Sequence, residues 1–192
     1  MNAKKKQAIF VIVLLLIQTI SALSHPTGNM ITVGDDVLWP YIYPIDDTNH
    51  KASIMIWNKN SEPKIFLQSE HSASDFMLYN NNDEIYIVER RFLQTTQSFE
   101  VRLLKTTVNT QPKVIWNWIK DDWRIGEGGF IMLNDNQMVF ARHPEIYSLI
   151  KGEKPKKFFD FDQPIKRIRA VAPNLILLMN DSACFMVQHV PY

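Results

Sequence analysis

Aromatic side chains at alternate positions are the residues whose type and spacing could do chemistry in this chain. Trp39 and Tyr41 stand two residues apart, and so do Trp116 and Trp118. In a strand, residues two apart point to the same face, so each pair would form one aromatic surface. Flat rings of this kind bind sugars and peptides, so the four residues are our candidate ligand-binding residues. The alternative is that the same rings pack between layers of the fold.

Other polar residues show no spacing typical of a catalytic or metal centre. The histidines are scattered, HExxH and GxSxG motifs are absent, and no paired histidine spacing for zinc occurs. Asp121-Asp122 and Asp160/Asp162 could offer carboxylates for acid–base work or calcium, but such residues more often cap turns or solvate a face. We therefore assign no catalytic, cofactor-binding or metal-binding residue, and we favour a protein that is not an enzyme.

A short unit recurs along the chain, consisting of proline, lysine and a bulky apolar stretch. It begins at Pro63, Pro112 and Pro155. These intervals fall within about 40–50 residues, which is typical of a four-stranded propeller blade. The repeat therefore predicts that one kind of structural unit is used several times.

Within each unit, short stretches rich in β-branched and aromatic residues alternate with turn residues. The first unit predicts strands at 30–33, 37–43, 53–57 and 65–68. The second and third predict strands at 76–79, 85–89, 99–104, 114–119, 130–133, 138–141, 146–150 and 158–161. The fourth predicts only three, at 168–171, 175–179 and 184–187.

This pattern resembles β-propeller repeats over roughly residues 30–190. The residues that carry the resemblance are the Pro-Lys strands and the turns at Asp35, Asn81, Asn134 and Asn174. The signatures of the WD-repeat and kelch subfamilies are absent, so no subfamily is assigned. The resemblance implies an all-β fold with about three full four-stranded blades and an incomplete fourth. An antiparallel β-sandwich or barrel is the alternative.

The incomplete fourth unit leaves an open strand edge, which natural proteins usually cover. Three arrangements would cover it. The chain could be a fragment of a longer propeller, or two copies could join edge to edge as a homodimer. In the third arrangement, residues 25–30 supply the missing outer strand.

The first residues predict export from the cytoplasm. Lys4, Lys5 and Lys6 precede an apolar run over 8–17, and small residues precede a cut between Ser24 and His25. This is the pattern of a secretory signal peptide, so we expect a signal peptide at 1–24, a propeller-like domain at 25–192 and a secreted or periplasmic location. An uncleaved anchor is the alternative, and no other apolar run is long enough to span a membrane.

The charge is nearly balanced, with 21 Lys and Arg against 20 Asp and Glu, which gives no reason to expect a nucleic-acid partner. A basic stretch between Lys151 and Arg169 could meet an acidic polymer, lipopolysaccharide or a membrane surface, or it could simply protect strand edges. The single cysteine, Cys184, lies in an apolar stretch and is expected to be buried.

No motif demands a reaction, so the sequence favours an exported, non-catalytic module that binds a protein or a glycan. The alternatives are an extracytoplasmic hydrolase or lyase of propeller type, with its site in the central channel, and a fragment of a longer propeller protein. Fold analogy alone does not choose among them. Two or more carboxylates or histidines facing one another in the channel would favour the enzyme.

Overall fold

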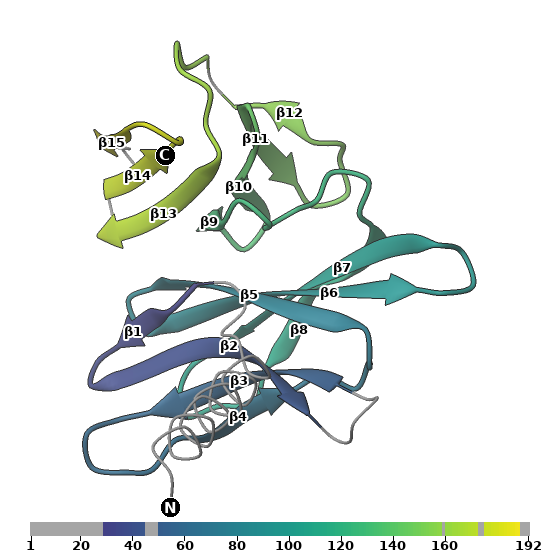
Figure 1. Ribbon diagram of the computed structural model, residues 1–192, viewed down its shortest axis with the longest axis vertical. Helices are drawn as coiled ribbons and strands as arrows, with labels where there is room; N and C mark the ends of the chain where they lie inside the picture. Colours follow the sequence, from purple (N-terminus) through teal and green to yellow (C-terminus); the bar gives the residue numbers. More distant parts are fainter. Residues whose placement is uncertain (1–28, 45–49, 159, 173–174, 189–192) are drawn as a thin grey trace, which may run out of the picture.

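The computed structural model describes residues 29–44, 50–158, 160–172 and 175–188, so the expected signal segment, 1–24, lies outside the described residues. The described chain forms four small antiparallel sheets arranged in a ring, which is a β-propeller-like arrangement (Figure 1). Three sheets have four strands and the last has three. The predicted all-β, propeller-like fold with an incomplete fourth blade is therefore confirmed.

Each sheet is a meander in which strands pair in chain order. Sheet A contains β1 (Ile31–Val33), β2 (Asp36–Pro44), β3 (His50–Trp57) and β4 (Lys64–Gln68). Sheet B contains β5 (Ser74–Asn81), β6 (Glu84–Leu93), β7 (Ser98–Thr106) and β8 (Lys113–Lys120). Sheet C contains β9 (Phe130–Asn134), β10 (Gln137–Arg142), β11 (Glu145–Ile150) and β12 (Lys156–Lys157). Sheet D contains β13 (Arg167–Ala172), β14 (Leu175–Met179) and β15 (Cys184–Gln188).

The Pro-Lys units begin the outer strands of sheets A, B and C, as the repeat predicted. In sheet C, however, the strand predicted at 158–161 is wrong, because β12 pairs only Lys156 and Lys157 with β11. The rings of Phe158 and Phe161 pack against the hydrophobic core instead. The N–H of Phe158 still donates to the carbonyl oxygen of Ile146 at 2.9 Å, but Asp160 and Phe161 are not part of a strand.

The Asn and Asp turns are also used, with small shifts in position. The side chain of Asn134 accepts a hydrogen bond from the backbone N–H of Asn136 at 2.9 Å, which closes the β9–β10 turn. In the β5–β6 turn, Asn82 takes the left-handed backbone conformation (φ 54°), while Asn81 ends β5. Asn174 lies outside the described residues.

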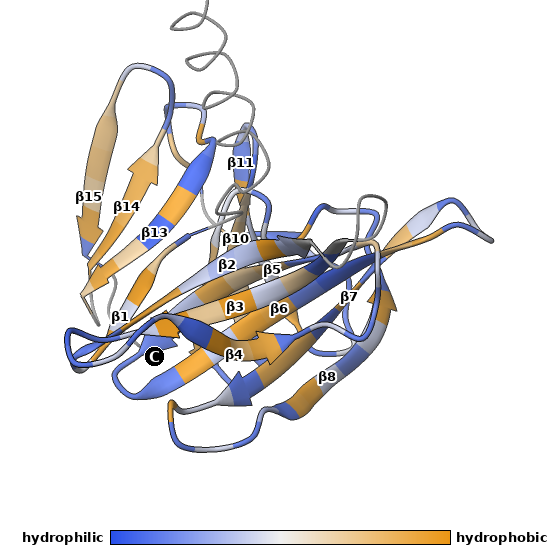
Figure 2. Ribbon diagram, turned by 60° about the horizontal axis from the view of Figure 1, so that its bottom comes forward, coloured by the Kyte–Doolittle hydropathy of each residue, from blue (hydrophilic) through white to orange (hydrophobic). Residues whose placement is uncertain are grey.

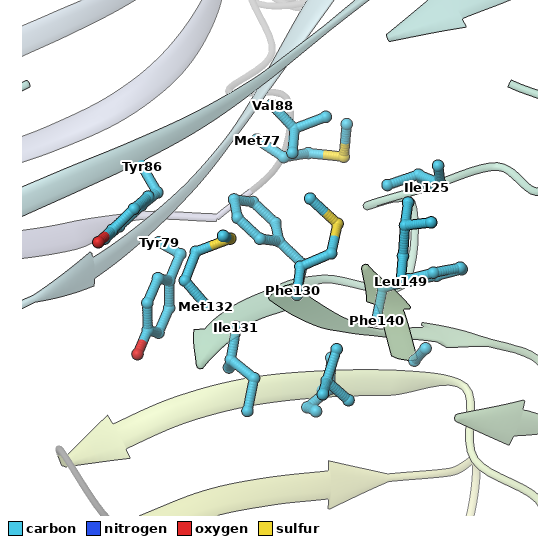
Figure 3. Close-up of a cluster of buried hydrophobic side chains, with 14 of the residues drawn as sticks. Met77, Tyr79, Tyr86, Val88, Ile125, Phe130, Ile131, Met132, Phe140 and Leu149 are labelled. Atoms are coloured by element: carbon cyan, nitrogen blue, oxygen red, sulfur yellow. The ribbon is translucent and has the colours of Figure 1, made fainter. Parts of the chain in front are cut away.

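Sheet B is buried on both faces along β5 and the first half of β6. Phe76 and Leu78 of β5 belong to the core cluster shared with sheet A, whereas Met77 and Tyr79 belong to the cluster shared with sheet C. Side chains from sheets B and C meet in this second cluster (Figure 3). Burial on both faces explains why β5 reads as a continuous apolar run rather than an alternating one. Figure 2 shows hydrophobic residues concentrated in the strands and hydrophilic residues in the loops.

Two adjacent glycines allow sheets C and D to approach closely. The N–H of Ile168 donates a 2.7 Å hydrogen bond to the carbonyl oxygen of Gly128. A Cβ at Gly129 would collide with the Ile168 carbonyl oxygen, and Gly129 has a φ of +86°. The contact therefore needs a residue without a side chain and with left-handed freedom.

The outer edge of sheet D has no neighbouring strand within the described ranges. Cys184 and Met186 both lie exposed on β15, and Met186 is 71% exposed. The prediction of a buried Cys184 is wrong, because alternation along β15 puts it on the exposed face. Asn29 bonds to Leu78 of sheet B, so the described part of 25–30 does not extend sheet D. Completion by a second copy or by a longer chain stays a prediction.

Nowhere in the described ranges does a helix reach the length and apolar content that a membrane crossing requires.

Candidate functional site

The first strand of each sheet is its inner strand, and residues on or beside these four strands border a cavity of about 560 Å³. The lining residues come from the start of sheet A, the β5–β6 turn, the first residue of β9, and β13. In Figure 1, β13 lies across from β1 and β5 around this region. All four sheets therefore contribute to the cavity, which makes it the candidate site.

Two asparagines join the walls from sheets A and B. The Asn29 amide bonds both backbone groups of Leu78: its oxygen accepts from the N–H at 3.0 Å and its nitrogen donates to the carbonyl. The Asn80 amide nitrogen donates to the carbonyl oxygen of Thr32 at 2.9 Å. These bonds hold β1 and β5 together and occupy the backbone groups that an added strand would need.

Arg169 lines the opposite wall, on β13. Its side chain is half-buried, and burial together with the nearby positive charge of Arg167 lowers the pKa of its guanidinium. A Cβ built on Gly129 would lie 3.2 Å from an Nη atom of Arg169, so the guanidinium sits close against this glycine. No ion pair or side-chain hydrogen bond links Arg169 to another described residue.

The rest of the cavity lining is mostly apolar or carries amide groups, together with the hydroxyl-bearing residues Thr32 and Tyr79. Met30 and Val171 are 64% and 55% exposed, and they come from the sheet A and sheet D sides of the cavity. Asp83 is the one carboxylate among the described lining residues, and no histidine is among them. The arrangement can offer hydrogen bonds, apolar contact and one positive charge to a ligand.

Three cations of the basic stretch predicted between Lys151 and Arg169 form ion pairs with described carboxylates. Its paired members are Lys156 with Glu153, Lys157 with Glu145 and Asp160, and Lys166 with Asp181. Lys151 donates to the carbonyl oxygen of Ile115 at 2.7 Å. Lys154 and Arg167 are exposed and form no ion pair with a described residue, and Arg169 is the member that lines the cavity.

The predicted aromatic residues lie away from the cavity. Trp39 and Tyr41 are half-buried on β2, where the Tyr41 ring contacts Tyr43 at 6.4 Å between centroids. Trp116 of β8 is buried at 4% exposure, and its indole N–H donates to the carbonyl oxygen of Asp135 at 2.8 Å.

Trp118, also on β8, contacts two arginines of its own sheet and a histidine of the connection before β5. The Arg91 guanidinium lies 3.9 Å from its ring centroid, the Arg102 guanidinium 4.7 Å, and the His71 ring 5.4 Å. The structure places one predicted aromatic pair on sheet A and the other on sheet B. Ligand binding by these residues stays a prediction.

A buried charge cluster lies where the loop after β8 meets sheet B. Arg90 pairs with Asp75 at 3.0 Å and with Glu127. Asp121 accepts a 2.9 Å hydrogen bond from the N–H of Ile125. Burial raises the pKa of both Asp75 and Asp121, and each has one buried oxygen without a hydrogen-bond partner. The cluster ties this loop to the sheet.

The predicted acidic pairs are separated by their surroundings. Asp121 is buried, whereas Asp122 is exposed and pairs with Lys120 at 2.9 Å. Asp160 pairs with Lys157, and Asp162 is exposed beside a separate, smaller pocket. Among the described residues no group of three or more metal-ligating side chains is assembled. Neither acidic pair lines the central cavity.

Sequence reasoning missed the polar residues that build the cavity, chiefly Asn29 and Asn80. A signal was present, because the first strand of each repeated unit becomes the inner strand around the axis of a propeller. Arg169 was noted only as part of the basic stretch. A scan against protein-family models found no match, and searches of the curated proteins and of the solved structures found none either.

Proposed function

We propose that this protein is an exported, non-catalytic binding module whose ligand, a glycan or a segment of another protein, occupies the central cavity. The observation that carries the proposal is the convergence of all four inner strands on one cavity of about 560 Å³. This volume lies within the range of about 300–1,000 Å³ that is usual for small-molecule sites. A few amide groups and one guanidinium among apolar residues can orient a ligand there.

The charges of the cavity lining support binding over catalysis. General acid–base hydrolysis commonly needs two titratable groups facing the scissile bond. The described lining offers one carboxylate, Asp83, and no histidine. The hydrolase or lyase alternative would therefore have to operate without the facing pair that such chemistry uses.

The proposed export rests on the basic and apolar pattern of the first 24 residues. Expression in a secreting host should yield a chain that begins at His25. Intact mass and N-terminal sequencing of the secreted product measure this directly. Retention of the first 24 residues in a membrane fraction would favour the anchor alternative instead.

The cavity can be tested by filling it. Ala170 is exposed and lines the cavity, so Ala170→Trp should block ligand entry without removing a core residue. Ala183→Trp, at an exposed turn outside the cavity, is the matched control. Full-length secreted protein and both variants would be applied to a glycan array, with thermal melts to confirm folding.

We expect glycan signals that Ala170→Trp abolishes and Ala183→Trp retains. Equal binding by both variants would place the ligand elsewhere and contradict the proposal. Release of shortened sugars from a bound glycan would contradict the non-catalytic part and favour the enzyme.

A further inference from the structure

Arg169 differs from the other half-buried arginines of the described chain. Arg90, Arg91 and Arg102 each pair with a carboxylate, at 3.0 Å, 2.7 Å and 2.6 Å. Arg169 is half-buried too, yet no described carboxylate pairs with it. An unpaired charge that is partly removed from water is unfavourable, so such groups normally have a partner. Here the missing partner can come from a ligand, because Arg169 lines the cavity.

The neighbouring charges reinforce this need. Arg167, two residues away on β13, adds a second positive charge and further disfavours the protonated guanidinium. Lys166 is already neutralised by Asp181. Asp83, the one lining carboxylate that the structure describes, belongs to the β5–β6 turn of another sheet and forms no ion pair with Arg169. An anion bound at Arg169 would therefore meet a locally positive wall.

The opposite wall favours a saccharide over an extended peptide. A peptide would add to a strand edge through free backbone N–H and C=O groups. At β5 the backbone groups of Leu78 are taken by Asn29, and the Thr32 carbonyl is taken by Asn80. Sugar hydroxyls can both donate and accept, so they can use the oxygen and nitrogen atoms of exposed amides such as Asn82.

We infer that the cavity binds an acidic saccharide whose carboxylate pairs with the Arg169 guanidinium. The planar guanidinium can donate two parallel hydrogen bonds to a carboxylate, which gives orientation as well as affinity. Met30 and Val171 offer apolar contact to the sugar ring from the two sides of the cavity. This inference rests on the proposed function and adds the charge and class of the ligand.

The test uses a pair of probes that differ by a methyl group on the carboxyl, which removes its negative charge. Oligogalacturonate and its methyl ester share one sugar backbone, and a tripeptide with a free C-terminal carboxylate supplies the same anion from a peptide. Binding of each to the full secreted chain would be measured by calorimetry. The variants are Arg169→Gln, Arg169→Lys and the neighbouring control Arg167→Gln.

We expect the acid form to bind, the ester to bind weakly, and Arg169→Gln to lose affinity by about tenfold to a hundredfold. Arg169→Lys should retain part of the affinity, because it keeps the charge but not the two parallel hydrogen bonds. Arg167→Gln should change affinity much less.

Equal binding of acid and ester that Arg169→Gln does not affect would overturn the inference. If Ala170→Trp still blocked this binding, the proposed function would stand. Binding of the tripeptide alone, dependent on Arg169, would overturn the saccharide assignment. If none of the three probes bound, the inference would also be overturned. The glycan-array measurement would then test the proposed function separately.

Discussion

Sheets B and D are both meanders, but they differ in how far they are buried and in how their arginines are paired. Sheet B is covered on both faces, and its half-buried arginines are paired with carboxylates. Sheet D has three strands, an outer strand with Met186 71% exposed, and two arginines on β13 that form no ion pair with a described residue.

The difference teaches that burial and ion pairing are concentrated in one blade, while another keeps exposed apolar and cationic side chains. In sheet B, each half-buried arginine has a carboxylate partner, and β5 and β6 contribute side chains to both core clusters, so the sheet joins its two neighbours. In sheet D, Met186 and Val171 are exposed, and Arg167 and Arg169 form no ion pair with a described residue. Substitutions in the two regions should therefore differ both in size and in the property that they change.

The largest effect is expected for Glu89→Ala in sheet B. Glu89 is 1% exposed and accepts hydrogen bonds from Ser69 Oγ and Arg102 Nε, each at 2.6 Å. Removing it leaves a partly buried arginine without its partner, which should lower the free energy of unfolding by about 3–5 kcal/mol. Denaturant unfolding measures this. Asp122→Ala, in an exposed pair with Lys120, should cost about 1 kcal/mol or less; equal losses would refute the contrast.

Gly129→Ala should have the next largest effect, at the contact between sheets C and D. Gly152→Ala is its matched control, because both glycines have positive φ but only Gly129 faces the Ile168 carbonyl. The backbone strain is therefore common to both, and overpacking should cost Gly129→Ala about 1–3 kcal/mol more. Thermal melts of the two variants provide the comparison. Indistinguishable melting temperatures would mean that sheet D can shift away freely.

The smallest effect is expected in the pH dependence of Asp121→Asn. Burial raises the pKa of Asp121 above its ordinary value of 3.8, so the folded state favours the protonated carboxyl. The stabilisation is fully present below that ordinary value and is lost as pH rises through the raised folded pKa. The asparagine does not titrate, so its stability relative to the unmodified protein should improve from pH 3 to pH 7. Unfolding curves across this range would test the sign, with Asp122→Asn as control.

Much of the fold was predictable because strand signals are local. Alternation and turn residues identified the strands of sheets B and D within a few residues. Local side chains close several of these turns, as where Asn180 accepts from the backbone N–H groups of Ser182 and Ala183 between β14 and β15. The prediction of a strand at 158–161 was wrong because Phe158 and Phe161 pack on the core. This packing depends on residues that are distant in the sequence. The prediction that Cys184 is buried was wrong for a similar reason. An apolar run does not reveal which face of its strand is exposed, nor that the strand is the outermost of its sheet.

The candidate site was less predictable than the fold. Whether Arg169 has a carboxylate partner depends on which side chains other sheets bring near it, and no spacing along the chain records this. The aromatic candidates were chosen by residue type and alternation alone, which are equally typical of packing. Trp116, whose indole N–H bonds the Asp135 carbonyl, shows how a core residue can carry the same pattern as a ligand-binding one.

The pairing of every strand with its neighbour in the chain has a consequence for how the molecule folds. Closing a short turn costs little conformational entropy, so each meander can form with few distant contacts. The contacts between sheets then couple four separate units, as in other repeat architectures. Amide exchange should accordingly be graded. It should be slowest in β6, which is paired on both edges and contributes to both core clusters, and fastest at β15, an edge strand with exposed side chains.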